Sequence, residues 1–157
     1  MPEAGAAQPA GGPAPGRASL LRTGSYLAFD FGLKRVGVAS GNTVLGHASP
    51  LRTLAAEGDA RFAAIERLIR EWQPDALVVG VPFHPDGAEH DNTRRARRFA
   101  RQLQGRFGLP VHEVDERYST TEALADGARD ADAAAAAVIL DQFLRALPER
   151  DDAAARR

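Results

Sequence analysis

The sequence predicts an α/β domain built on a five-stranded mixed sheet with helices on both faces. Three observations predict it: short apolar runs follow one another closely within residues 26–49, the apolar spacing becomes helical from Asp59 onward, and two later apolar runs each follow a helical segment. Hairpin-joined strands followed by alternating helices and strands give a sheet with an antiparallel and a parallel part. The 157 residues suffice for one such domain and are too few for two.

A three-strand antiparallel meander is expected to begin the domain. The apolar runs 26–31 and 35–40 are separated by a few residues that include Gly32, which is typical of a β-hairpin. The dipeptide Gly41-Asn42 is a turn signal, and a third strand is expected after it at residues 44–49.

Helices and buried strands are expected to alternate in the rest of the domain. Residues 59–72 carry apolar side chains at spacings of three and four, with Asp59 in position to cap the helix and Pro74 beyond its end. Residues 76–81 are apolar throughout, as in a strand that is buried on both faces. The remaining expected elements are a helix at 92–106 stopped by Gly108, a strand at 111–115, a short helix opened by the capping box Ser119-x-x-Glu122, and a helix at 132–147 ended by Pro148.

The folded domain is expected to span residues 25–148. Residues 1–24 are rich in alanine, proline and glycine and hold little that could pack, so we expect a disordered tail there. Residues 149–157 are expected to form a frayed tail.

Composition excludes several classes of protein. The chain has no cysteine, which excludes a disulfide framework, a thiolate nucleophile and a cysteine-ligated zinc site. A formal net charge of −1 excludes a uniformly basic nucleic-acid coat, although local basic patches can still bind a polyanion. No apolar run approaches the ~18–20 residues of a membrane span, and the first residues lack the apolar stretch of a secretory signal. We therefore expect a cytoplasmic protein without a membrane partner.

Two acidic positions near strand ends could carry chemistry. Asp30 lies in an apolar strand, and ionised carboxylates are seldom buried unless they are paired or bound to metal. The alternative is that Asp30 only ends the strand and caps the turn at Gly32. Glu116 follows the fifth strand in the triplet Asp115-Glu116-Arg117, a favourable place for an active site in an α/β sheet. For the triplet alone, a surface turn with an internal ion pair is the simpler explanation.

Helix phase points to a third acid. At ~100° per residue, Asp132 lies within about 20° of the apolar stripe that contains Ile139, so its carboxylate should face the sheet. Asp130 would fall on the opposite side, and Asp141 would face away. The alternative is the ordinary preference of an acid for a helix N-terminus. Three carboxylates on a central strand, a neighbouring strand end and a covering helix would suit two Mg²⁺ ions, which prefer carboxylate and water ligands.

Through these positions the chain resembles the bacterial YqgF family. The likeness covers roughly residues 26–147, in order, through residues 28–39, residues 79–82 with Asp86-Gly87 after them, residues 115–123, and the stretch from Asp132 to Leu140. The family is described both as Holliday junction resolvases and as nucleases that process pre-16S rRNA, with an RNase H-like fold. The resemblance implies Mg²⁺ as cofactor, with Mn²⁺ as its substitute. It implies catalytic and metal-binding roles for Asp30, Glu116 and Asp132, and roles near the phosphates for Lys34, Arg35 and Arg117.

One segment departs from the family pattern. Residues 124–131 form a shorter and less basic stretch than family members usually carry between the Asp-Glu-Arg block and the last aspartate. The departure puts in doubt any contact between that loop and a substrate. It also leaves Asp130 as a rival to Asp132 for the third acid, although helix phase favours Asp132.

The expected helix at 92–106 is strongly basic. It carries six arginines and no acid, so a polyanion is a natural partner, whereas the alternative is a solvated outer face. The six are Arg94, Arg95, Arg97, Arg98, Arg101 and Arg106. We expect nucleic-acid contacts from Arg94, Arg95 and Arg98, and from the hydroxyls of Ser119 and Thr120, although capping alone also explains Ser119. For His84 and His90 an exposed loop position is the simpler interpretation.

These features together predict a metal-dependent endonuclease that hydrolyses phosphodiester bonds of structured nucleic acid. The resemblance implies processing of the 5′ end of pre-16S rRNA as the leading function. Two alternatives stay open: a Holliday junction resolvase, and a catalytically inactive nucleic-acid-binding module. Phosphate contacts carry no sequence information, so the arginines do not separate RNA from branched DNA. Both a monomer and a homodimer are compatible with the sequence.

Overall fold

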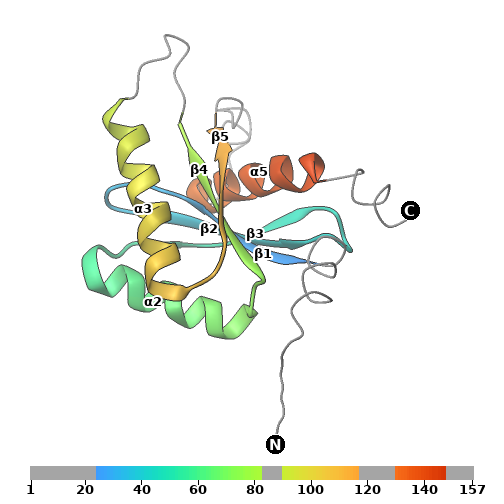
Figure 1. The fold of residues 1–157 in the computed structure, drawn as a ribbon, viewed down its shortest axis with the longest axis horizontal. Coiled ribbons are helices and arrows are strands. Elements are labelled where there is room, and N and C mark those ends of the chain that lie inside the picture. Colours follow the sequence, from blue (N-terminus) through green and yellow to red (C-terminus); the bar gives the residue numbers. More distant parts are fainter. Residues whose placement is uncertain (1–23, 83–89, 117–129, 148–157) are drawn as a thin grey trace, which may run out of the picture.

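The computed structural model describes residues 24–82, 90–116 and 130–147. In it, one five-stranded sheet has the strand order β3-β2-β1-β4-β5 (Figure 1). β1 pairs with β2, and β2 with β3, in the antiparallel sense, whereas β4 is parallel to both β1 and β5. The strands are β1 at Ser25–Asp30, β2 at Val36–Asn42, β3 at Ala48–Leu54, β4 at Ala76–Val81 and β5 at Val111–Asp115. The predicted mixed sheet, with its antiparallel meander and its parallel part, is confirmed.

Helices cover both faces of this sheet, as the sequence predicts (Figure 1). On one face, α2 and α3 pack against the side chains that include Leu27 and Phe29 of β1. On the other face, α5 packs against the alternate side chains, which include Tyr26 and Ala28. The alternation follows from the period of two along a strand. The helices are α2 at Gly58–Trp72, α3 at Asp91–Phe107 and α5 at Ala131–Ala146.

The third strand begins later than the sequence predicts. The expected strand at 44–49 is wrong, because β2 continues to Asn42 and a turn follows it. The Asn42 side-chain oxygen accepts a hydrogen bond from the Leu45 amide at 2.8 Å, and Gly46 takes a positive φ of 75°. Val44 and Leu45 are therefore 74% and 63% exposed. Local turn chemistry outweighs the strand preference of two apolar residues.

Helix ends agree with the sequence signals in part. Gly108 ends α3 with a left-handed backbone at φ 68°, as predicted. The cap of α2 differs, because Glu57 rather than Asp59 occupies the N-cap and no side chain caps the helix there. The tails predicted at 1–24 and 149–157, Gly24 apart, and the short helix predicted to start at Ser119 lie outside the described residues. Among the described helices, none has the length and apolar character needed to cross a bilayer.

Candidate active site

Asp30 ends the central strand on the face that α5 covers. It follows Tyr26 and Ala28 in the alternation of β1, and both of those residues pack against α5. Its cross-strand partner on β2 is Gly37. The last residue pair between β1 and β4 is Phe29 with Val79, so Asp30 and Gly80 each come next along their strands. The residues beside Asp30 on the two neighbouring strands are therefore both glycines, Gly37 on β2 and Gly80 on β4.

Gly80 makes room for Glu116. Glu116 follows β5 directly and has the same alternation as Val114, which packs against the α5 cluster. A Cβ atom at Gly80 would lie 2.9 Å from Glu116 Cγ and 2.4 Å from Ile139 Cδ1 of α5. Because Gly80 has no side chain, Glu116 can lie over β4 toward Asp30.

Gly37 makes room for the first turn of α5. A Cβ atom at Gly37 would lie 1.8 Å from the carbonyl oxygen of Asp132 and 2.8 Å from the amide nitrogen of Ala133. The backbone of α5 therefore touches β2 where β2 pairs with Asp30. The structure brings together the three acids that the sequence singled out: Asp30, Glu116 and Asp132.

The pKa of Asp30 reflects its burial and the two neighbouring carboxylates. The pKa of Asp30 is raised to about 7, first by burial and then by the negative charges of Glu116 and Asp132 and by a hydrogen bond with Glu116. Three acids that repel one another at the end of a central strand form a centre with excess negative charge. Such a centre favours a bound cation, which would stabilise all three ionised forms.

Asp130 has a different task from Asp132. It is the N-cap of α5, and its side chain accepts a hydrogen bond from the Ala133 amide at 3.2 Å. The Thr53 hydroxyl of β3 donates a second bond to the same carboxylate oxygen. The Asp130 carboxylate is therefore occupied in capping. The expectation that Asp141 faces away from the sheet is wrong, because Asp141 accepts a hydrogen bond from the Ala48 amide of β3 at 2.8 Å.

Two basic residues stand on the loop that joins β1 to β2. Arg35 Nε lies 2.9 Å from Asp132 Oδ2, and the Arg35 side chain is 64% exposed. Lys34 beside it is exposed. The loop therefore presents two positive charges, and that of Arg35 lies against Asp132. The other predicted phosphate contacts, Arg117, Ser119 and Thr120, lie outside the described residues, as does His84.

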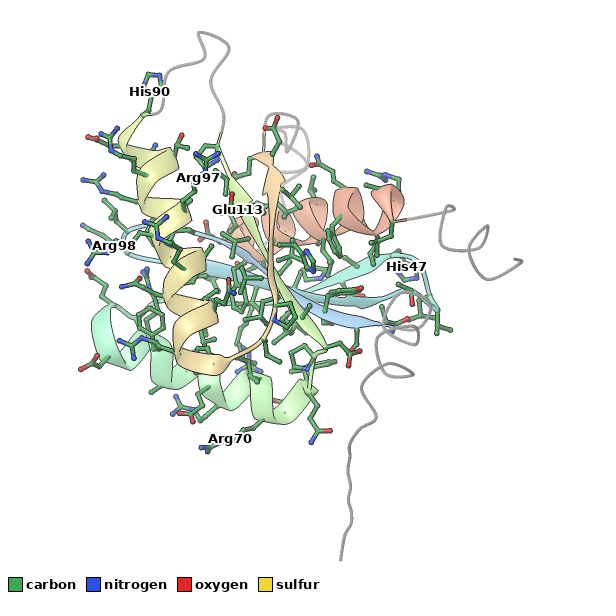
Figure 2. All side chains as sticks on the ribbon, in the orientation of Figure 1. His47, Arg70, His90, Arg97, Arg98 and Glu113 are labelled. Atoms are coloured by element: carbon green, nitrogen blue, oxygen red, sulfur yellow. The ribbon has the colours of Figure 1, made fainter. Side chains whose placement is uncertain are left out.

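The basic helix α3 lies on the opposite face of the sheet from the acids. Some of its arginines are paired: Arg94 with Asp91, Arg97 with Glu113 of β5, and Arg106 with Asp59 of α2. Arg95, Arg98 and Arg101 are exposed and form no ion pair within the described residues. Figure 2 shows Arg97 turned toward Glu113, whereas Arg98 points away from the sheet and His90 stands at the start of the helix. The α3 arginines thus form a surface separate from the acidic centre.

Sequence reasoning missed three residues that shape the site. Gly37 and Gly80 act through contacts between elements far apart in sequence, and no local signal marks them. Arg61 is 6% exposed and donates hydrogen bonds to backbone carbonyls at the start of α2 and in the β1–β2 loop. Helix phase could have found Arg61, because it precedes the buried Ile65 by four residues and so lies on the inner side of α2.

The acids suit a hard divalent cation by their chemistry. Carboxylate oxygens are the ligands that Mg²⁺ prefers, and Mg²⁺ usually keeps several waters and uses only one or two carboxylates together with substrate phosphates. Within residues 24–82, 90–116 and 130–147, no three acidic or histidine side chains are arranged as a complete metal-holding group. Asp30, Glu116 and Asp132 therefore fit as a partial ligand set, with Arg35 already engaged on Asp132.

Comparisons with known proteins agree with this architecture. Residues 24–146 match the family model RuvX, described as a Holliday junction resolvase. A Polaromonas sp. JS666 protein is 71% identical over 124 residues, which cover 79% of this chain and 90% of that protein. An Albidiferax ferrireducens protein is 72% identical over 123 residues, which cover 78% and 79% respectively. Both relatives are named "Putative pre-16S rRNA nuclease".

A solved structure shares the fold at low sequence identity. The structure of Thermus thermophilus RuvC in complex with a Holliday junction substrate aligns with a TM-score of 0.51 and 15% identity, covering 78% of this chain and 94% of that one. The likeness confirms the predicted RNase H-like architecture, of which RuvC is an example. Since the family model spans most of the chain and the relatives are more than two-thirds identical to it, this chain belongs to the RuvX family, also called YqgF.

Proposed function

We propose that this protein is a metal-dependent endonuclease that hydrolyses phosphodiester bonds in structured RNA, at the 5′ end of pre-16S rRNA. The observation that carries the proposal is the gathering of Asp30, Glu116 and Asp132 at the end of the central strand. The names of the relatives support RNA as the substrate. We expect the protein to act in the cytoplasm, where ribosomal RNA is processed.

In this proposal the three acids hold one or two Mg²⁺ ions, for which Mn²⁺ can substitute. When bound, such ions lower the pKa of water and stabilise charge on phosphate oxygens. Asp30 is the central ligand, because it interacts with both other acids. Glu116 and Asp132 approach it from β5 and α5, each over a glycine. The close contacts of Gly37 with the α5 backbone and of Gly80 with the Glu116 side chain would hold the acids in place.

Basic and hydroxyl side chains position the substrate backbone in this proposal. Lys34 and Arg35 flank the acids and would contact phosphates near the scissile bond, together with Arg117, Ser119 and Thr120. The α3 arginines, Arg94, Arg95 and Arg98, would contact nucleic acid farther away, because they lie on the other face of the sheet. Contacts of this kind orient a polyanion without reading its sequence.

A Holliday junction resolvase is the second candidate. The description of the matching family model favours it. A resolvase cuts two strands of a symmetric junction and would favour a symmetric dimer, whereas RNA processing is compatible with a monomer. An inactive nucleic-acid-binding module is the third candidate, favoured by the incomplete ligand set among the described residues.

One cleavage experiment separates these candidates. The purified protein is incubated with a labelled pre-16S rRNA fragment or a labelled four-way DNA junction, in Mg²⁺, Mn²⁺ or EDTA. Metal-dependent cutting of the RNA alone supports the proposal, and paired symmetric cuts in the junction select the resolvase. If a folded protein binds RNA but cuts neither substrate with either metal, the binding module is correct.

Matched variants assign the cutting to this site. We expect Asp30→Asn, Glu116→Gln and Asp132→Asn each to lower the rate beyond the ~10–100-fold typical for residues that only support a metal ligand. The control Glu113→Gln removes an acid from the opposite face of β5, where it pairs with Arg97, and should leave the rate nearly unchanged. Asp130→Asn tests the rival acid: asparagine caps a helix about as well as aspartate, so both the cleavage rate and the stability should stay close to those of wild type. A fully active Asp132→Asn protein would remove Asp132 from the mechanism.

A further inference from the structure

A buried arginine stands in the first turn of α2. Arg61 is 6% exposed and lies on the inner side of the helix with Phe62 and Ile65. Charged side chains are rarely buried unless their polar groups are satisfied, because the loss of water is costly. Burial accordingly lowers the pKa of Arg61. Neither metal binding nor phosphate contact, as proposed above, uses this residue.

The partners of Arg61 are backbone groups and a ring. Its Nη2 donates to the Leu33 carbonyl at 2.9 Å, and its Nε donates to the Ala56 carbonyl at 2.8 Å. Its guanidinium carbon lies 5.6 Å from the centre of the Phe31 ring. Among the described residues, no carboxylate lies within ion-pair distance of it. The fork of guanidinium donors therefore joins α2 to the loop between β1 and β2.

That loop is the one that carries Lys34 and Arg35. At its start, the Phe31 ring packs against Phe99 of α3 with ring centres 5.1 Å apart. In the middle of the loop the Leu33 side chain is 58% exposed, so its side chain does not anchor the loop. The Leu33 carbonyl, held by Arg61, is the attachment at this point.

We infer that Arg61 is a positioning residue, which fixes the β1–β2 loop so that Lys34 and Arg35 meet the nucleic-acid backbone beside Asp30. The inference rests on the proposed function, since it assigns the loop to substrate binding. The competing explanation is that Arg61 only stabilises the fold. The two explanations differ in whether the effect of Arg61 on binding passes through Lys34 and Arg35.

A double-mutant cycle distinguishes them. Binding of a labelled pre-16S rRNA fragment is measured in EDTA, where no cutting occurs, over a range of salt concentrations. We expect Arg61→Met to weaken binding several-fold and to reduce the salt dependence, because each lost phosphate contact removes about 0.7–0.9 from the slope. In a protein that already carries Lys34→Gln and Arg35→Gln, the same substitution should cause almost no further loss. The control Arg70→Met, on the exposed side of α2, should leave binding nearly unchanged.

Arg61→Lys keeps the experiment decisive if the methionine variant does not fold. Lysine retains the charge and the stem but lacks the fork that reaches two carbonyls, so binding should fall between wild type and the loop double variant. Trypsin should cut after Lys34 or Arg35 faster in Arg61→Lys than in wild type at the same melting temperature, with mass spectrometry identifying the cut. Unchanged binding and unchanged cutting at the loop in a folded variant would overturn the inference. The inference would also be wrong if the Arg61 substitution weakened RNA binding equally in the wild-type protein and in the Lys34→Gln/Arg35→Gln protein. Failure of the wild-type protein to bind the RNA would instead overturn the proposed function.

Discussion

Arg35 Nε lies 2.9 Å from Asp132 Oδ2 and thereby links the β1–β2 loop to the first turn of α5. The side chains are 64% and 33% exposed, and ion pairs this open contribute only about 0–1 kcal/mol to stability. The ion pair therefore contributes little to the stability of the fold, and its main effect is on the charge of the site. Arg35 places one positive charge on an acid that also raises the pKa of Asp30.

The pair predicts opposite effects of Arg35→Gln on two ligands. Removal of the guanidinium frees Asp132, so we expect Mn²⁺ to bind more tightly, as measured by calorimetry. The same change removes a phosphate contact, so RNA affinity in EDTA should fall. Arg70→Gln is the control, because it removes a similarly exposed ion pair from α2. If Mn²⁺ affinity fell or stayed constant in Arg35→Gln, Arg35 would not compete for Asp132.

The raised pKa of Asp30 predicts how stability depends on pH in the absence of metal. The folded protein holds the Asp30 proton up to about pH 7, whereas the unfolded chain releases it near the ordinary aspartate pKa of about 4. The folded state thus binds more protons between these values, and the free energy of unfolding falls as pH rises through that interval. Asn at position 30 cannot ionise and escapes this loss.

Thermal melts in EDTA test that dependence. We expect the melting temperature of Asp30→Asn to exceed that of wild type by an amount that grows from pH 5 to pH 8. Other titrating groups are common to both proteins, so they largely cancel in the difference. Mg²⁺ should shrink the difference at pH 8, because a cation stabilises the ionised form. A difference that stayed constant across pH would show that Asp30 titrates normally.

Much of the site could be predicted from the sequence, because its signals are local. Asp30 stood out among apolar neighbours, and helix phase separated Asp132 from Asp130. The structure places Asp132 near Asp30, as the pattern predicts, whereas Asp130 caps α5 and contacts Thr53 of β3 instead of turning away from the sheet. The direction of Glu116 toward Asp30 also follows from a local pattern, the alternation of side chains along β5.

The remainder depends on contacts that no local pattern encodes. Gly37 and Gly80 are required by parts of α5 and β5 that lie many residues away. The sequence predicts too early a start for β3, because Val44 and Leu45 resemble a strand, whereas a hydrogen bond from the Leu45 amide to the Asn42 side chain fixes a turn. The basic helix was recognised, but its place on the face opposite the acids follows only from the packing of the sheet.

Gly80→Ala should damage activity more than stability. The new Cβ would meet Glu116 Cγ at 2.9 Å and Ile139 Cδ1 at 2.4 Å, so both side chains must shift. Overpacking of this kind costs about 1–3 kcal/mol, and the displaced Glu116 should lower the cleavage rate in addition. Gly105→Ala on α3 is the matched control, since nothing lies within 4 Å of its Cβ, and it should stabilise the helix by about 0.5–1 kcal/mol.

Denaturant melts and single-turnover cleavage, measured on the same samples, separate the two effects of Gly80→Ala. The expected result is a protein that remains folded at the assay temperature and cuts slowly even at saturating Mg²⁺. Full activity in a destabilised Gly80→Ala protein would mean that Glu116 reaches its working position without this gap.

The arginines of α3 predict a binding contribution that is independent of the acids. Arg95 and Arg98 are exposed, and neither forms an ion pair with any residue that the structure describes. If both contact the phosphates of an RNA duplex, the double variant Arg95→Gln/Arg98→Gln should lower the salt dependence of binding by about 1.8, at about 0.9 for each contact. The cleavage rate at saturating RNA should stay close to that of wild type, because α3 packs on the other face of the sheet from Asp30.

A second double variant makes that result specific to α3. Arg67→Gln/Arg70→Gln changes the net charge by the same amount on α2, where both side chains are exposed. Fluorescence anisotropy over a range of salt concentrations gives both slopes with the same labelled RNA. A change confined to the α3 variant assigns the phosphate contacts to that helix. Equal changes in the two variants would mean that the RNA responds only to net charge, and the arginines of α3 would then be an ordinary solvated surface.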